Sequence, residues 1–293
     1  MDKWANIGRF VLSAIEATES RVGLTFHRTF SLSTPSISKI LLLSHDTGGQ
    51  LNASEIRKST TLGTVYIEAM PRYARACGLM EMGSYQLTPF GELVCQRDPH
   101  LTNPATLWLM HYYLSTPQGP GPAFWSHLVT HCLSFGEETA AGQIAAEIDR
   151  FVESQERAQR PQERTIRSTV TVFVGTYTKT DGLGRLRLLE KVPGRDGCVR
   201  VGEPQSPPPY AVAYALADYW SFHYDDQATL SLSELARDDG FGRVMWMDPR
   251  QLDETLDALR LEGGILDLFR VAPPHQVARL WSSKDELLAR LYD

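Results

Sequence analysis

Residues 52–94 carry a series of local signals whose order restricts the fold more than any other part of the sequence. Asn52, with Glu55 three residues later, is a capping-box pattern, which predicts the start of a helix. The segment TTLG at 60–63 predicts a turn, and apolar residues at helical spacing predict a second helix over about residues 64–77. A short helix, a tight turn and a second helix are therefore expected in direct succession.

The residues after this second helix indicate how it ends and which elements come next. Gly78 suits the left-handed conformation that ends many helices. Gly83 and Ser84 predict a hairpin turn, and Pro89 is typical of the first turn of a further helix. The complete order of helix, turn, helix, hairpin and helix is that of a winged helix-turn-helix module.

A similar order of signals occurs near the C-terminus, within residues 231–272. Ser231 with Glu234 forms a second capping-box pattern, and Asp248-Pro249 predicts another helix start. We therefore expect a mainly α-helical protein of the α+β class. It would have an N-terminal winged helix-turn-helix, a helical middle and a second winged-helix-like unit at the C-terminus.

Changes in composition divide the chain into three regions. The stretch around Pro161 is polar and arginine-rich, and three consecutive prolines at 207–209 predict a stiff surface connection. Apolar stripes predict three helices, over 104–114, 123–133 and 138–158. The predicted domains are an N-terminal winged-helix and helical domain over 1–158, a basic, proline-rich connecting region over 159–209 and a C-terminal winged-helix-like domain over 210–293.

The net charge of −6 argues at first against a nucleic-acid ligand, but the charges are unevenly distributed. Residues 157–202 contain ten Lys or Arg and four acidic residues, whereas residues 203–293 contain eight and sixteen. Residues 98–156 contain a single basic residue, Arg150, and seven acidic ones. A protein zoned in this way can bind a polyanion through one face while it stays acidic overall. The alternative is that 157–202 is a solvated loop region.

The sequence contains no signal for a membrane or for secretion. Its longest apolar runs, such as residues 104–114, are about half as long as a membrane span requires. The N-terminus has a helical period over residues 4–18, with acidic residues, and lacks the features of a signal peptide. The four cysteines lie far apart without paired spacing, as expected of reduced thiols. We expect a cytoplasmic protein without a membrane partner.

No group of residues resembles a complete active site. His127 and His131 lie one helical turn apart with Cys132 adjacent, but no further metal ligand stands at a suitable spacing. His223 and Asp225 lack a candidate nucleophile or metal partner. We therefore expect a protein that is not an enzyme and that has no cofactor and no metal.

One long segment resembles the signature of the bacterial "domain of unknown function 4007" family. This segment is LTPFGELVCQRDPHLTNPATLWLMHYYL, at residues 87–114. The family pattern joins L-T-P-x-G-E-L to D-P-x-L-x-x-P-A-T-L-W-L-x-H. The matching residues are Leu87, Thr88, Pro89, Gly91, Glu92, Leu93, Asp98, Pro99, Leu101, Pro104, Ala105, Thr106, Leu107, Trp108, Leu109 and His111. In FHRTFSL, at 26–32, Arg28 stands where the family has an acid.

The resemblance implies a cytoplasmic bacterial protein from a defence or DNA-modification neighbourhood, in company with sulfur-transfer genes of the phosphorothioation type. It implies no catalytic residue, because the family has no established activity to carry over. From the residues themselves, we interpret the matching block as structural. Pro104 suits a helix start, and Leu107, Trp108 and His111 share one face of that helix, as packing requires.

The first winged-helix pattern contains residues suited to holding DNA. A recognition helix needs an outward row of side chains that reach bases, with Lys or Arg nearby for phosphates. Arg72 and Arg75 occupy such a row in the helix over 64–77, and the wing and the basic central segment extend the surface. The candidate DNA-binding residues are Arg57, Lys58, Thr61, Thr64, Arg72, Arg75, Ser84, Tyr85, Gln86, Arg164, Arg167, Lys179, Arg185 and Arg187.

A second interpretation uses the same module as a scaffold. Glu68 and Arg72 are spaced for an intrahelical ion pair, and Pro71 is unusual in a recognition helix. Our leading hypothesis is a non-catalytic accessory subunit of a bacterial antiphage or DNA-modification system, which binds double-stranded DNA and uses its acidic C-terminal unit to bind other subunits. The alternative is a protein–protein adaptor in such a system, without direct DNA contact.

Overall fold

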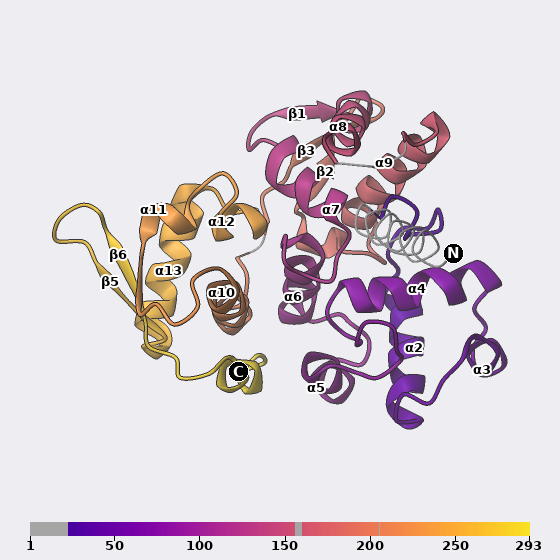
Figure 1. Ribbon diagram of the computed structural model, residues 1–293, viewed down its shortest axis with the longest axis horizontal. Coiled ribbons are helices and arrows are strands. Elements are labelled where there is room, and N and C mark those ends of the chain that lie inside the picture. The colour runs from indigo at the N-terminus through magenta and orange to yellow at the C-terminus, as the bar shows by residue number, and fades with distance from the viewer. Residues whose placement is uncertain (1–22, 156–159, 205) are drawn as a thin grey trace, which may run out of the picture.

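The computed structural model describes residues 23–155, 160–204 and 206–293 (Figure 1). This part of the chain is mainly helical and contains two small three-stranded antiparallel sheets, which confirms the expected α+β class. No helix in it is long and apolar enough to cross a membrane. The helix expected over residues 4–18 lies outside the described residues.

The helices and strands of the N-terminal half are mostly short. In chain order they are α2 (Thr34–Asp46), α3 (Ala53–Ser59), α4 (Thr64–Ala76), α5 (Pro89–Arg97), α6 (Pro104–Ser115), α7 (Ala123–His127), the π-helical turn η1 (Leu128–Cys132), β1 (Glu138–Ala140), α8 (Ala141–Ser154) and α9 (Glu163–Thr178). The rest of the chain forms η2 (Gly184–Leu186), β2 (Leu189–Lys191), β3 (Cys198–Val201), α10 (Pro209–His223), β4 (Thr229–Ser231), α11 (Leu232–Leu235), α12 (Phe241–Val244), α13 (Pro249–Gly263), β5 (Leu266–Phe269), β6 (Gln276–Arg279) and α14 (Lys284–Ala289).

Local signals place α3 and α4 where the sequence predicts them. The Asn52 side chain accepts hydrogen bonds from the backbone N–H groups of Ser54 and Glu55, at 2.9 and 3.1 Å. The Glu55 carboxylate accepts the Asn52 N–H at 2.7 Å, which completes the predicted capping box. Helix α4 continues through Pro71, and Gly78 follows it with a φ of +73°.

The hairpin predicted after α4 is short. Met80 pairs with Leu87 in one isolated bridge, and the Glu81 N–H donates to the Gln86 carbonyl at 2.9 Å. Gly83 turns the chain with a φ of +75°, a conformation that favours glycine. The order of helix, turn, helix, hairpin and helix is therefore present over α3, α4, this hairpin and α5, with a minimal pairing of strands.

Residues 159–209, expected from the sequence to be a connecting region, contain a core helix and two strands. Val170, Phe173 and Tyr177 are residue types that favour strands, but their spacing is helical. They therefore share one face of α9, and this face is buried. Strand β3 pairs with β1 on one side and with β2 on the other. The segment up to residue 201 thus packs onto the N-terminal half, and the proline-rich stretch after it leads to α10.

The C-terminal region begins with α10 and continues through β4, the short helices α11 and α12, and the longer helix α13. Strands β5 and β6 then form a hairpin, and the sheet has the order β4-β6-β5. Val277 at its centre pairs with Leu230 on one side and Leu268 on the other. In Figure 1 this hairpin projects from the left end of the molecule, far from α3 and α4.

Two side chains, Arg243 of α12 and Trp246 just after it, attach the C-terminal region to the middle of the chain. The Arg243 guanidinium donates to the Thr130 carbonyl at 3.1 Å and to the Leu133 carbonyl. The Trp246 indole N–H donates to the Val129 carbonyl at 3.1 Å. Carbonyl groups at the end of a helix lack partners within the helix, so these bonds both satisfy the η1 backbone and fix α12 against it.

Candidate nucleic-acid interface

The turn between α3 and α4 is surrounded by exposed cations. Arg57 and Lys58 lie in the last turn of α3, and neither has a carboxylate partner among the described residues. Thr61 in the turn and Thr64 at the start of α4 are exposed as well. Lys39 of α2 donates a hydrogen bond to the Thr61 hydroxyl at 3.3 Å, and so adds a third cation to this surface.

Arg75 is used inside the protein. Its guanidinium donates two hydrogen bonds, of 2.9 and 2.7 Å, to the Ser84 carbonyl and lies 5.0 Å from the centre of the Tyr85 ring. The Ser44 hydroxyl of α2 donates to the Tyr85 carbonyl on the same hairpin. Gln86 remains exposed. Arg75 therefore holds the hairpin against α4, and its donors are occupied by that contact.

Arg72 is half-buried, and its guanidinium donates to the Phe26 carbonyl at 3.4 Å. Burial, together with the nearby Arg28, lowers the pKa of Arg72. The expected intrahelical pair with Glu68 is absent, because Glu68 pairs instead with Arg28 at 2.9 Å. A partner from a loop 40 residues away thus takes the place of the neighbour four residues along the helix.

A surface hollow of about 550 Å³ lies between the loop at residues 24–29 and the starts of α4 and α9. Its lining includes Val65 and Glu68 of α4, Arg28 of the loop and Arg164 of α9. Arg164 is exposed and has no carboxylate partner among the described residues. The hollow brings Arg164 close to the start of α4, although 99 residues separate it from Val65 in the sequence.

The other basic residues predicted in the central region lie apart from α4 or are paired. Arg167 pairs with Glu163 one turn away, and Arg187 pairs with Glu190 at 2.9 Å. Lys179, Arg185 and Arg187 follow the far end of α9, whose 16 residues make it about 24 Å long. Lys179 donates to the Ser31 hydroxyl at 3.4 Å, and Arg185 is exposed.

Lys39 and Lys191 are two further exposed cations. Lys39 was not among the candidate DNA-binding residues, whereas Lys191 belongs to the basic central segment that was expected to extend the DNA-binding surface. The period of α2 buries Ile37 and Ile40, and it leaves Lys39 on the opposite, exposed side. Lys191 is the exposed end of β2, where burial decreases from Leu189 outwards. The exposure of both side chains follows from the amphipathic pattern of their elements, and this pattern could have identified Lys39.

Positive charge is available to a ligand in the part of the chain before α10 and is neutralised in the C-terminal region. Of the eight Lys and Arg side chains within residues 206–293, seven form ion pairs with carboxylates. These are Arg237, Arg250, Arg260, Arg270, Arg279, Lys284 and Arg290. Among the described residues up to 204, by contrast, several exposed cations have no carboxylate partner: Arg57, Lys58, Arg97, Arg164, Arg185 and Lys191.

The family model described as "Protein of unknown function (DUF4007)" matches residues 25–292, nearly the whole chain. This protein belongs to the DUF4007 family. The match confirms the resemblance found in residues 87–114. No curated protein shows a significant match to the chain.

The fold of this DUF4007 protein is similar to that of two solved structures. One, described as "Magnesium ion-bound SspB crystal structure", has a TM-score of 0.76 at 19% identity and covers 92% of this chain and 86% of its own. The other, "SspB crystal structure", has a TM-score of 0.72 at 20% identity with the same coverage. At this identity the likeness establishes a shared fold. The described residues of the present chain contain no group of three His, Cys, Asp or Glu side chains placed to hold a metal.

The segment that carries the DUF4007 signature consists largely of caps and buried contacts. The Thr88 hydroxyl accepts the Gly91 N–H at 3.0 Å and thereby caps α5. The Asp98 carboxylate accepts N–H groups of Thr102 and Asn103, at 3.0 and 2.9 Å, in the turn before α6. His111 on α6 is completely buried. These contacts give the family signature a structural role.

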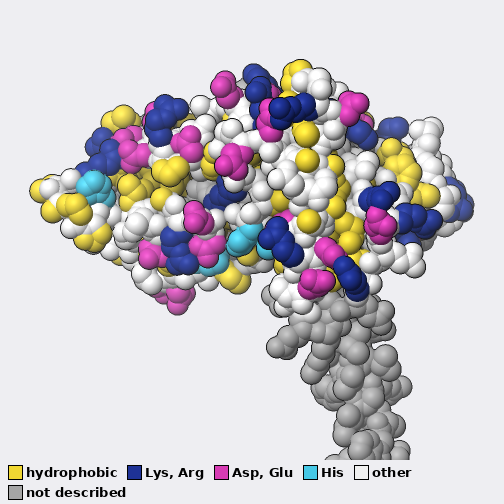
Figure 2. Space-filling model, turned by 90° about the horizontal axis from the view of Figure 1, so that it is seen from above, with side chains coloured by type: hydrophobic (Ala, Val, Ile, Leu, Met, Phe, Trp, Pro, Cys, Tyr) yellow, Lys and Arg dark blue, Asp and Glu magenta, His cyan; other side chains and the backbone are white. Residues whose placement is uncertain are grey.

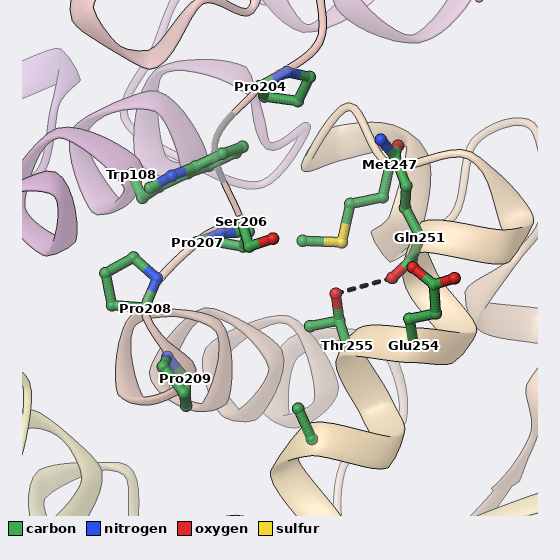
Figure 3. A pocket seen from close by; sticks show the side chains of 11 residues that line it. Trp108, Pro204, Ser206, Pro207, Pro208, Pro209, Met247, Gln251, Glu254 and Thr255 are labelled. Atoms are coloured by element: carbon green, nitrogen blue, oxygen red, sulfur yellow. Dashed lines mark hydrogen bonds between the residues drawn. The ribbon is translucent and has the colours of Figure 1, made fainter.

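A pocket of about 360 Å³ separates α6 from α13 in this family member (Figure 3). Figure 3 shows Trp108 on one side, Met247 facing it, and Pro207, Pro208 and their neighbours along the segment that leads to α10. Its described lining contains one charged side chain, Glu254, and no cation. Since a phosphate ligand needs positive charge, the pocket is not part of the candidate interface.

Proposed function

We propose that this chain is a non-catalytic, DNA-binding accessory subunit of a bacterial antiphage defence or DNA-modification system. Membership of the DUF4007 family supports the setting, which the family resemblance implies. The segregation of unpaired cations outside the C-terminal region supports DNA as the ligand. This observation carries the proposal. The C-terminal region neutralises its own cations, whereas α3 and the start of α9 leave Arg57, Lys58 and Arg164 available to phosphates.

In this proposal the N-terminal module acts as a winged helix, and duplex DNA lies against α3 and the starts of α4 and α9. Arg57, Lys58 and Lys39 contact phosphates around the α3–α4 turn, and Arg164 extends the contact. Arg75 positions the hairpin from behind. A contact made by so few cations is weak and strongly salt-dependent, because phosphate neutralisation supplies most of the non-specific affinity.

Replacing both Arg57 and Lys58 by glutamine is expected to weaken duplex binding and to flatten its salt dependence. Each phosphate contact contributes about 0.9 to the slope of log affinity against log salt, so the double variant should lose about 1.8 of that slope. Fluorescence anisotropy with a labelled random duplex, titrated at several salt concentrations, measures both quantities.

The matched control is the double variant Arg250→Gln and Arg260→Gln, which removes the same charge from the C-terminal region, where both cations are ion-paired. Its salt slope should equal that of the unaltered protein. Arg75→Gln releases the hairpin from α4. This variant should clearly lower the thermal stability and should reduce the salt slope only slightly. Equal slopes for the Arg57/Lys58 variant and the unaltered protein would remove α3 from the interface.

A protein–protein adaptor is the second candidate, and the apolar surface of the β5–β6 hairpin favours it. Val271 is 100% exposed and Phe269 is 50% exposed. Hydrophobic side chains gather at the left tip of the molecule in Figure 2, where this hairpin lies. Arg270 pairs with Asp253 and Asp257 of α13, at 2.7 and 2.8 Å, so the hairpin is held firmly against α13. Apolar side chains exposed together in this way commonly mark interaction sites.

Val271→Asp is expected to abolish binding of a partner subunit while it leaves duplex binding unchanged. A charged side chain at the centre of an apolar contact has to be desolvated without a partner, which costs several kcal/mol, about enough to lower the affinity a hundredfold or more. The measurement is co-purification with the products of neighbouring genes after nuclease treatment. If the adaptor is the whole function, partner binding is lost in this variant and the unaltered protein binds no duplex at low salt.

The absence of a catalytic role is part of the proposal and has its own test. The purified protein is incubated with supercoiled plasmid in the presence of Mg²⁺, because one structural neighbour is a magnesium-bound form. Intact supercoils support an accessory subunit. Nicked or linear plasmid, formed in proportion to protein and without contaminating nuclease, would contradict it.

A further inference from the structure

The exposed face of α9 is a straight strip that leads away from the proposed interface. Arg164, Thr171 and Thr178 are seven residues apart, and positions seven apart drift by only about 20° around a helix. Arg164 and Thr171 are exposed, and Thr178 is half-buried. The strip is as long as the helix, about 24 Å for its 16 residues.

Two surface hollows follow this strip and join into one groove. The first, of about 550 Å³, lies between α8 and the first half of α9. The second, of about 380 Å³, lies between the second half of α9 and the hairpin formed by β2 and β3. Ala141, Val170 and Thr171 line both hollows, so the groove is continuous.

The far end of the groove is basic. Lys179 follows α9, Lys191 ends β2, and Arg195 lies between β2 and β3; all three line the second hollow. Arg195 pairs with Glu138 at 2.6 Å, an exposed pair that a phosphate can replace at little cost. Lys179 and Lys191 have no carboxylate partner among the described residues. Three cations from separate segments thus surround a hollow whose lining has one acid, Asp196.

The floor of the groove indicates which form of nucleic acid fits. The described lining contains no aromatic side chain. The first hollow also carries two acids, Asp149 and Glu163, and both are ion-paired with arginines, so the unpaired charge of the groove lies at its Lys179 end. Single strands are typically held by aromatic rings on which the bases stack. A duplex presents its phosphates outwards and needs cations alone. The groove therefore suits the backbone of a double helix.

We infer that the Lys179 end of this groove is a second phosphate-contact site for the same duplex that binds at α3 and Arg164. The inference rests on the proposed function and adds the form of the ligand and its extent. With one phosphate per about 3.4 Å along each strand, a 24 Å separation corresponds to about seven base pairs. The two clusters contact the duplex backbone about two-thirds of a helical turn apart.

The test combines Lys179→Gln with Lys191→Gln and measures anisotropy of a labelled duplex of about 20 base pairs at several salt concentrations. The salt slope should fall by about 1.8, and the loss should add to that of the Arg57/Lys58 variant. The matched control, Arg150→Gln with Arg200→Gln, removes two exposed cations that pair with Glu147 and Glu190 and do not line the groove. Its slope should stay that of the unaltered protein.

The possible outcomes separate this inference from the proposed function. An unchanged slope in the Lys179/Lys191 variant, beside a reduced slope in the Arg57/Lys58 variant, overturns the second site and leaves the first intact. Equal losses in the Lys179/Lys191 and Arg150/Arg200 variants show a general charge effect and also overturn the site. A larger loss on a single strand of the same length than on the duplex contradicts the assignment to duplex backbone. If the unaltered protein binds no duplex, the proposed function fails first.

Discussion

Replacing His111 by alanine is expected to lower the free energy of unfolding by about 3–5 kcal/mol. The ring is completely buried on α6 and joins three parts of the fold. Its Nε2–H donates to the Val244 carbonyl at 3.0 Å, and its Nδ1 accepts the Tyr177 hydroxyl at 3.0 Å. It also stacks on Trp246, with 5.4 Å between ring centres. Alanine would leave a cavity and would remove the hydrogen-bond donor of the buried Val244 carbonyl, whereas the Tyr177 hydroxyl would keep Ser115 and Trp125 as partners.

Urea unfolding followed by tryptophan fluorescence measures this loss, because Trp108, Trp125, Trp220 and Trp246 are buried in the core. The matched control is His100→Ala, a change of the same type at an exposed position, which should shift the midpoint little. The unfolding midpoint of Tyr177→Phe should fall between those of the two histidine variants, since this change removes one hydroxyl and keeps the ring. A His111→Ala midpoint equal to that of His100→Ala would show that the network contributes nothing to stability.

The protein is expected to lose stability steeply below about pH 6.5 because two buried histidines stay neutral in the folded state. Burial lowers the pKa of His27 to about 4 and that of His111 to about 3. In the unfolded chain both titrate near 6.5. Between these values the unfolded state binds more protons than the folded state, so stability is full above pH 6.5 and falls as the pH is lowered.

Each such histidine contributes a slope of about 1.4 kcal/mol per pH unit, so the pair should remove roughly 4 kcal/mol between pH 6.5 and 5. Urea midpoints at half-unit intervals of pH measure the slope. His27→Asn isolates one histidine from all other titrating groups, and its slope over this interval should be lower by about 1.4 kcal/mol per unit. An identical pH slope in the variant would exclude His27 as the source.

Features set by neighbours in the sequence were predictable. The capping box of Asn52 and Glu55 and the left-handed Gly78 and Gly83 involve groups within a few residues of one another, so the sequence places them correctly. The signature in residues 87–114 likewise identified the family. The secondary structure of α9 was ambiguous from the sequence, because its valines and threonines favour strands while their spacing is helical.

The chemistry of individual side chains was not predictable in the same way. Arg75 and Arg57 are both exposed cations as far as their sequence context shows, yet Arg75 is bound to Ser84 and Arg57 has no described partner. The hairpin that folds back onto α4 makes this difference. Sequence spacing similarly suggested that Glu68 pairs within its own helix, and the loop that carries Arg28 provided a nearer partner.

The sequence by itself determined the class of fold, the family, the positions of most helices and the zoning of charge along the chain. The tertiary structure alone decided which charges remain available to a ligand. Arg279 pairs with Asp226 across 53 residues, and Arg270 with Asp253 across 17, whereas Arg164 reaches the start of α4 with its charge unpaired among the described residues. An ion pair forms only within a few ångströms, and chain folding, rather than composition, sets which side chains come that close.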